Sequence, residues 1–400
     1  MKNALLLILA TIFVPVAISQ TPNQKISIDV SGAEALINVF DAMQHGESSQ
    51  QIDVLLDKAL ALNPYLVSAE RFTAKDQNSP VTLEEYRNYI KSLSTDSVDD
   101  RGNRRLAFLK PRYIDAYQNL SVYKNLIEQV KSLSKEDIDN MLKQATDWLP
   151  NDVKVNAELL VMFDIGGAAW AYRASDAKDY IMFSVLFLLD EDGTFSKEMF
   201  LKTVSHEIHH VGIPLNDFIT KVDYENLPDT SRLKLYVDFI AGIIKEGMAQ
   251  KFCSNAPCKF TEKPYPDEIY AAIPKAVENW DYFISDFGAI NDSAKTMISE
   301  IALNKIVNIE NFYERYANYW TWKAGAVENK EIVLGRRYYY GSEVLGLINS
   351  ALGKEPLFEI MYDFRKFPYY FNVALKKAKP ENFENYLFDE VVVDEILNLK

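Results

Sequence analysis

One stretch of eight residues holds three of the four histidines in the 400-residue chain, and it constrains the fold more than any other feature. It reads Val-Ser-His-Glu-Ile-His-His-Val and spans residues 204–211. Apolar residues around it predict one largely buried helix over Lys197–Val211. His206 and His210 stand four residues apart, so both imidazoles project from the same face of that helix. The chain must therefore give a buried helix partners for its ionisable groups, because burying them unpaired costs free energy.

The same residues form the pattern H-E-x-x-H, which is typical of a zinc site. The imidazoles of His206 and His210 can bind one zinc ion, while Glu207, displaced around the helix, can take a proton from zinc-bound water. The alternative is a solvated, charged helix, which the apolar flanking residues disfavour. His209 is not used by the pattern, and we expect it to face solvent or a partner behind the ligands. The expected cofactor is one zinc ion (Zn²⁺) per chain.

A catalytic zinc ion needs a third protein ligand, and histidine cannot supply it here. No histidine follows His210, and His45 stands in a turn that we expect at the surface, so the three-histidine metzincin pattern is excluded. The third ligand must therefore be a carboxylate. The acidic candidates downstream of the motif are Asp217, Asp223, Glu225, Asp229, Asp238 and Glu246.

Glu246 differs from the other acids in its surroundings. It lies on a predicted helix, Arg232–Phe252, in a run of apolar residues with Gly247 beside it. A glycine allows another helix to approach closely, and a carboxylate buried there needs a partner such as a metal. The alternative is an exposed acid next to Lys245.

These motifs resemble those of the gluzincin metallopeptidases, in which H-E-x-x-H is followed by a glutamate in the pattern E-G-x-A. Residues 246–249, Glu-Gly-Met-Ala, match that second pattern. The resemblance implies that His206, His210 and Glu246 are zinc ligands and that Glu207 is the general base. It also implies a zincin-like catalytic domain. The chain is most similar to uncharacterised exported bacterial proteins grouped as zinc-dependent peptidases.

A third segment resembles the Y-x-x-G sequence of aminopeptidase-type gluzincins. It begins at Tyr338 and ends at Gly341, and the resemblance implies that Tyr338 steadies the oxyanion of the transition state. Tyr339 and Tyr340 leave the register open, because three tyrosines stand in a row.

Two segments depart from the gluzincin pattern. Gln250 stands four residues after Glu246, where an acid would orient a ligand histidine, and a glutamine accepts that hydrogen bond less strongly. Residues 166–170, Gly-Gly-Ala-Ala-Trp, lack the acid of the G-x-M-E-N segment that binds a free N-terminus. The choice between endopeptidase and exopeptidase therefore stays open.

The rest of the sequence predicts an α+β fold that is mostly helical. Runs rich in Val, Ile and Phe predict strands over 155–163 and 180–189, which form a small sheet before the H-E-x-x-H helix. The segment Leu-Pro-Asn-Asp near residue 150 interrupts the helical pattern, so we expect an N-terminal helical region over 20–150 and a zincin-like metallopeptidase domain over 151–400. Further helices are expected over Asp267–Phe287, Ala294–Tyr319 and Arg337–Leu352.

Residues 1–19 have the pattern of a cleaved secretory signal peptide. Lys2 precedes an apolar run from Ala4 to Ile18, and small residues stand at the expected cleavage site after Ser19. We therefore expect a secreted or periplasmic protein.

An exported protein can form disulfides, and the chain has two cysteines, Cys253 and Cys258. Their C-x4-C spacing, with Asn and Pro between them, favours a small-loop disulfide. The alternative, a pair of metal ligands, would need further cysteines or histidines downstream, and none follow.

The charge balance limits the choice of partners. With 43 basic and 57 acidic residues, the net charge is −14, and phosphate contacts need a basic face, so we expect no nucleic-acid partner. No later segment is long and apolar enough for a membrane span, and the sequence does not fix the oligomeric state. We predict a zinc metallopeptidase acting on a peptide or protein. The alternatives are a non-catalytic zinc- or peptide-binding protein on the same scaffold and a helical adaptor with a coincidental motif.

Overall fold

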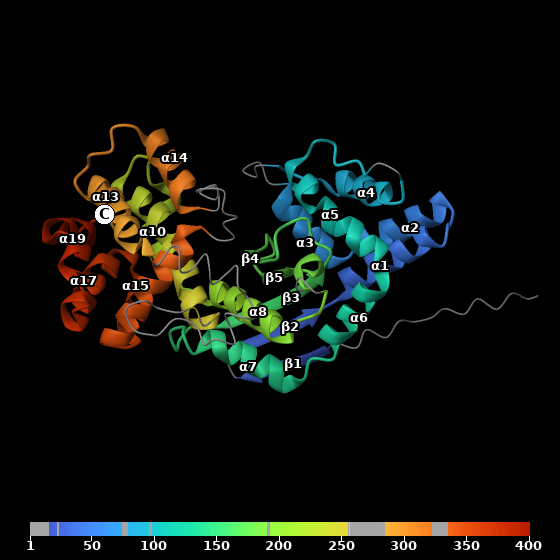
Figure 1. Ribbon diagram of the computed structural model, residues 1–400, viewed down its shortest axis with the longest axis horizontal. Helices are drawn as coiled ribbons and strands as arrows, with labels where there is room; N and C mark the ends of the chain where they lie inside the picture. The colour runs from blue at the N-terminus through green and yellow to red at the C-terminus, as the bar shows by residue number, and fades with distance from the viewer. Residues whose placement is uncertain are drawn as a thin grey trace, which may run out of the picture. The chain divides into compact units, whose positions relative to one another are not determined.

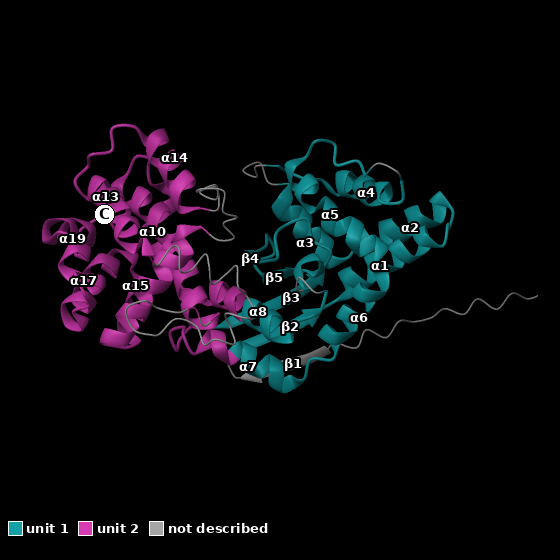
Figure 2. Ribbon diagram, viewed as in Figure 1, with its two compact units in different colours: residues 1–142, 154–204 teal, residues 143–153, 205–400 magenta. Residues whose placement is uncertain are grey.

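The computed structural model describes residues 16–21, 24–73, 79–95, 98–189, 193–254, 256, 285–321 and 335–400. The chain forms two compact units, which Figure 2 shows in different colours. Residues 1–142 and 154–204 make up the first unit, and residues 143–153 and 205–400 make up the second. Each unit therefore combines two segments of the chain.

The first unit contains a five-stranded sheet with the strand order β1-β2-β3-β5-β4 (Figure 1). Its strands are β1 (Val16–Thr21), β2 (Gln24–Asp29), β3 (Val155–Met162), β4 (Ala169–Arg173) and β5 (Asp179–Ser184). Strands β2, β3 and β5 run parallel, while β1 and β4 are antiparallel to their neighbours. The expected fold class, mostly helical α+β with a small sheet before the H-E-x-x-H helix, is confirmed.

The N-terminal region contributes strands to this sheet as well as helices. Strand β2 pairs with β3 in parallel, from Gln24 opposite Val155 to Asp29 opposite Leu160. Residues on both sides of the boundary expected near residue 150 thus share one sheet. Strand β1 includes the last residues of the expected signal peptide, whose residues 1–15 lie outside the described part of the chain.

Among the described residues, seven helices precede β3, and the last of them continues into the second unit. They are α1 (Ser31–Gln44), α2 (Ser49–Leu60), α3 (Asn63–Phe72), α4 (Leu83–Ser92), α5 (Arg104–Gln118), α6 (Leu120–Lys131) and α7 (Lys135–Thr146). Helix α4 begins at a capping box. The Thr82 hydroxyl accepts a hydrogen bond from the Glu85 N–H at 3.1 Å, and the Thr82 N–H donates to the Glu85 carboxylate at 2.7 Å.

A buried carboxylate organises the turn after β3. Asp164 is fully buried and accepts hydrogen bonds from the Ser68 hydroxyl at 2.6 Å, the Trp170 indole N–H at 2.7 Å and the Gly166 N–H at 3.0 Å. A Cβ on Gly166 would lie 2.5 Å from both Asp164 Oδ2 and Trp170 Nε1. Packing around Asp164 therefore explains the glycine in this segment, which leads into β4 at the edge of the sheet.

Helices dominate the described residues that follow β5. They are α8 (Lys197–Gly212), α9 (Leu215–Lys221), α10 (Arg232–Met248), α13 (Phe287–Ala302), α14 (Ile309–Trp320), α15 (Arg336–Leu352), α16 (Glu355–Tyr362), α17 (Phe367–Ala378), α18 (Phe383–Tyr386) and α19 (Glu390–Leu397). A π-helical turn, Ala249–Cys253, follows α10 directly. Helix α8 begins in the first unit and belongs to the second from Ser205 onward. Within the described residues, no helix combines the length and apolar character needed to cross a bilayer.

In the second unit, α10 and α15 touch through two glycines. A Cβ on Gly247 would lie 2.5 Å from Gly341 Cα, and a Cβ on Gly341 would lie 2.8 Å from Gly247 Cα and overlap the Ile243 carbonyl oxygen. Neither position therefore has room for a side chain. This contact brings the end of α10 against the first two turns of α15.

Two expectations about the second unit are corrected. The single helix expected over Ala294–Tyr319 is two helices, α13 and α14, because the chain turns at Asn304, whose φ of 53° is left-handed. The disulfide is not present at Cys253, which is a free, fully buried thiol whose pKa is raised by burial. Cys258 and nearly all of the helix expected over Asp267–Phe287 lie outside the described residues.

We predict that Gly341→Ala lowers the free energy of unfolding by about 1–3 kcal/mol, because the added methyl group forces α10 and α15 apart. The matched control is Gly288→Ala on α13, where an added Cβ meets nothing within 4 Å, and it should cause no loss. Urea unfolding followed by circular dichroism measures both variants. Equal stability of the two variants would contradict the close packing of α10 and α15.

Candidate active site

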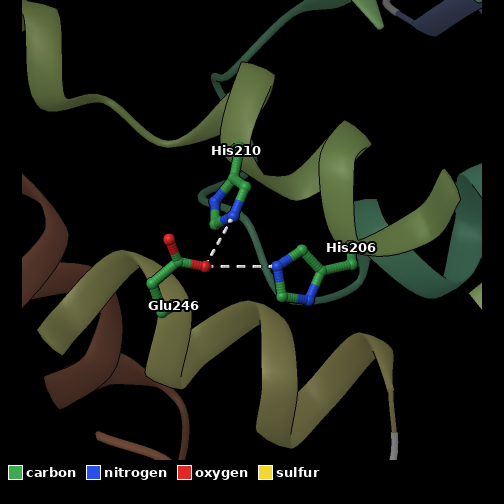
Figure 3. A group of neighbouring side chains, drawn as sticks. All are labelled: His206, His210 and Glu246. Atoms are coloured by element: carbon green, nitrogen blue, oxygen red, sulfur yellow. Dashed lines mark hydrogen bonds and ion pairs between the residues drawn. The ribbon is translucent and has the colours of Figure 1, made fainter. Parts of the chain in front are cut away.

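The two histidines of the motif and Glu246 point toward one another (Figure 3). Helix α8 carries His206 and His210, and α10 carries Glu246 near its C-terminal end. Nε2 of His206 lies 3.3 Å from Glu246 Oε2, and Nε2 of His210 lies 3.1 Å from the same oxygen. One possible ligand atom from each residue lies within 4.8 Å of the others.

Burial and charge act in opposite directions on these groups. The side chains of His206 and His210 are each 11% exposed, and that of Glu246 is 16% exposed. Burial lowers the pKa of His206, but its hydrogen bond to Glu246 and the charges of Glu207 and Glu246 outweigh this and raise it. Burial raises the pKa of Glu246, but His210 and His206 hold that pKa well below its usual range. Glu246 is therefore an ionised carboxylate.

The donor set fits a zinc ion. Two imidazole nitrogens and one carboxylate oxygen form the ligand set of many catalytic zinc sites, in which water takes the fourth position. Without a cation, both imidazoles share one carboxylate oxygen as their hydrogen-bond partner. Nδ1 of His210 is buried and has no hydrogen-bond partner among the described residues. A cation between the three groups would be bound by a lone pair from each of them.

Glu207 lies beside this group without being part of it. It is 8% exposed, and its charge acts on both His206 and Tyr338. No hydrogen bond connects its carboxylate to another described residue. This carboxylate is therefore available to exchange a proton with a ligand in the site.

The structure separates the three consecutive tyrosines. Tyr338, on the first turn of α15, has its ring centroid 6.5 Å from that of His206, with the ring planes 20° apart. Tyr340 is 1% exposed and donates a hydrogen bond to Asn291 Oδ1 at 2.9 Å, and Tyr339 is also buried. Burial and the charge of Glu246 raise the pKa of Tyr338, while Arg337 opposes them. The geometry thus selects Tyr338 as the tyrosine beside the histidines.

Arg337 is a site residue that sequence reasoning missed. Its Nη2 donates a hydrogen bond to Glu246 Oε1 at 3.3 Å, and its guanidinium carbon lies 5.2 Å from the centroid of the Tyr338 ring. One signal was available in the sequence. Arg336 and Arg337 stand together at the start of a predicted helix, where the helix dipole disfavours cations, so a specific partner was needed.

Two other predicted residues lie elsewhere. Gln250 falls in the π-helical turn, where the α-helical spacing from Glu246 is lost, and its side chain makes no hydrogen bond to His206 or His210 in the described part of the chain. His209 is fully buried and does not face solvent, with its Nε2 3.3 Å from the Trp148 carbonyl oxygen. Burial lowers the pKa of His209 to about 3.

The remaining acidic candidates do not join the group. Asp238 accepts hydrogen bonds from the hydroxyls of Tyr224 and Tyr313. The side chain of Asp217 lies outside the described residues. The exposed candidates are Asp223, Glu225 and Asp229.

The profile of one protein family, described as "Putative zinc dependent peptidase (DUF5700)", matches residues 56–380. The chain belongs to this family. The match covers more than half of the chain and includes His206, His210 and Glu246. The family description and this group of residues both support zinc as the metal. Neither the curated proteins nor the solved structures contain a significant match.

We predict that zinc stabilises the folded chain. At a free zinc concentration 100 times the Kd, binding to the native state adds about 2.7 kcal/mol to the free energy of unfolding. Thermal unfolding with zinc and then with excess chelator measures this difference. Glu246→Ala should reduce it strongly, whereas the control Glu225→Ala, at an exposed acid, should leave it unchanged. An equal zinc effect in both variants would remove Glu246 from the ligand set.

Proposed function

We propose that this chain is an exported peptidase that uses zinc bound by His206, His210 and Glu246. The observation that carries the proposal is the convergence of both histidines on one oxygen of Glu246, with Glu207 and Tyr338 alongside. The match to a family described as a zinc-dependent peptidase supports the same activity. Export is supported by the pattern of residues 1–19.

Each residue of the site has a role in peptide hydrolysis. Zinc would supply a Lewis acid that polarises the scissile carbonyl and lowers the pKa of a water molecule. Glu207 takes a proton from the attacking water and later gives it to the leaving amine. Tyr338 donates a hydrogen bond to the carbonyl oxygen as negative charge develops there. Burial raises the pKa of Tyr338, so its hydroxyl keeps its proton at neutral pH.

We predict that Glu207→Gln strongly lowers the rate of cleavage and retains zinc. A glutamine cannot accept the proton, so kcat should fall by about 10²–10⁴-fold, whereas the three ligands are unchanged. Cleavage of a fluorogenic peptide mixture and zinc content per chain measure the two effects, with Glu225→Gln as the control. Full activity of Glu207→Gln would reject this mechanism. A wild-type chain that holds zinc and binds these peptides without cleaving them would indicate the non-catalytic alternative.

We predict that Tyr338→Phe lowers kcat by about 10²–10³-fold with little change in KM, because the lost hydrogen bond forms chiefly in the transition state. Tyr340→Phe is the matched control on the same helix. It loses the hydrogen bond to Asn291 and should cost about 1 kcal/mol of stability while kcat stays near the wild-type value. Steady-state kinetics that assign the larger loss of kcat to Tyr340→Phe would contradict the placement of Tyr338.

A further inference from the structure

The two carboxylate oxygens of Glu246 face different partners. Oε2 lies 3.3 Å from His206 Nε2 and 3.1 Å from His210 Nε2, whereas Oε1 accepts a hydrogen bond from Arg337 Nη2 at 3.3 Å. The terminal torsion of a glutamate has a broad energy minimum, so the carboxylate turns easily. A group that binds Oε1 therefore restricts the rotation of the carboxylate and keeps the other oxygen facing the histidines.

The side chain of Arg337 packs against α10 near Gly242. A Cβ on Gly242, one helical turn before Glu246, would lie 3.4 Å from Arg337 Cδ and 3.0 Å from the Tyr316 hydroxyl. A side chain at this position would crowd the Tyr316 hydroxyl and touch the arginine, so Arg337 packs directly along this face of α10. The Arg337 side chain is 23% exposed, and its Nε is buried with no hydrogen-bond partner among the described residues. The guanidinium is therefore mostly buried, and its Nη2 donates its hydrogen bond to Glu246 in these surroundings.

The same guanidinium lies beside Tyr338. Its central carbon is 5.2 Å from the centroid of the phenol ring, close enough for an attraction between the cation and the ring face. Arg337 is thus in contact with a proposed metal ligand through one interaction and with the proposed oxyanion donor through another. Both interactions come from the first turn of α15.

We propose that Arg337 is a positioning residue that orients Glu246 for the metal and Tyr338 for the substrate. The effect on Tyr338 rests on the proposed peptidase function, whereas the effect on Glu246 is a statement about metal binding alone. The two effects are therefore tested by separate measurements.

The charge of Arg337 and its hydrogen bond have opposite effects on the affinity for zinc. Its positive charge repels a cation, so removing it for this reason alone would tighten zinc binding. Its hydrogen bond orients the ligand carboxylate, and loss of such a partner weakens metal binding by about 10–100-fold. Since Glu246 lies between Arg337 and the histidines, we expect the loss of orientation to be the larger effect.

The first test is competition for zinc between the purified full chain and a chromophoric chelator. Arg337→Gln should raise the Kd for zinc about 10–100-fold, and Arg337→Lys should lie between this variant and the wild type. The control is Arg232→Gln, which removes the ion pair of Arg232 with Glu395 at the other end of α10 and should leave the Kd unchanged. An unchanged or lower Kd in Arg337→Gln would overturn the proposal. If that variant does not fold, an Arg337→Lys Kd equal to the wild-type value would overturn it equally.

The second test is a double-mutant cycle on kcat at saturating zinc, with Arg337→Gln and Tyr338→Phe. If Arg337 acts through Tyr338, the double variant loses less than the product of the two single losses, because the second substitution removes an interaction already gone. Tyr338→Phe alone should leave the Kd for zinc unchanged. If the loss of kcat in the double variant equals the product of the two single losses, Arg337 does not act through Tyr338, and that part of the proposal is overturned. Absence of all cleavage in the wild type would instead reject the peptidase function and leave the zinc titration as the test of Arg337.

Discussion

The contact of α10 with α15 at Gly247 and Gly341 sets the geometry of the site. Glu246 immediately precedes the first glycine, and Tyr338 stands three residues before the second. Because the two backbones touch there, the carboxylate on one helix and the phenol on the other arrive at the same place. The E-G-x-A pattern on α10 and the Y-x-x-G pattern on α15 are about ninety residues apart in the sequence. They therefore lie on the two helices that meet at this contact.

Those parts of the site that depend on local geometry could be predicted from the sequence. The spacing of His206 and His210 is a property of one helix, and Glu246 was favoured because an acid in an apolar helix needs a partner. The role of Arg337 could not be predicted in this way. Its contact with Glu246 joins residues 91 positions apart. Gly247 predicts that a helix approaches Glu246, but the local sequence does not identify that helix or the residue that faces the carboxylate.

The helices and strands of the fold show the same limit of prediction from local patterns. Helices α8 and α15 were predicted nearly to the residue, because each shows a continuous apolar pattern. Strand β2 was missed, since Gln-Lys-Ile-Ser-Ile-Asp has only two apolar residues and becomes a strand by pairing with the distant β3. The break between α13 and α14 was also missed, because apolar residues continue at helical spacing on both sides of Asn304. The pairing of a strand and the break of a helix thus depend on residues outside the segment, so a local sequence pattern does not predict them.

The two glutamates near the histidines have the same chemistry and differ only in their neighbours. Both oxygens of Glu246 are bound, by His206 and His210 on one side and by Arg337 on the other, and its lowered pKa makes it a poor acceptor of protons. Glu207 is also mostly buried, yet no described residue donates a hydrogen bond to its carboxylate. In the proposed peptidase, Glu246 is the ligand and Glu207 is the base, and this difference in hydrogen-bond partners supports that division of roles. Arg337 contributes to that difference, because it occupies the Glu246 oxygen that does not face the histidines.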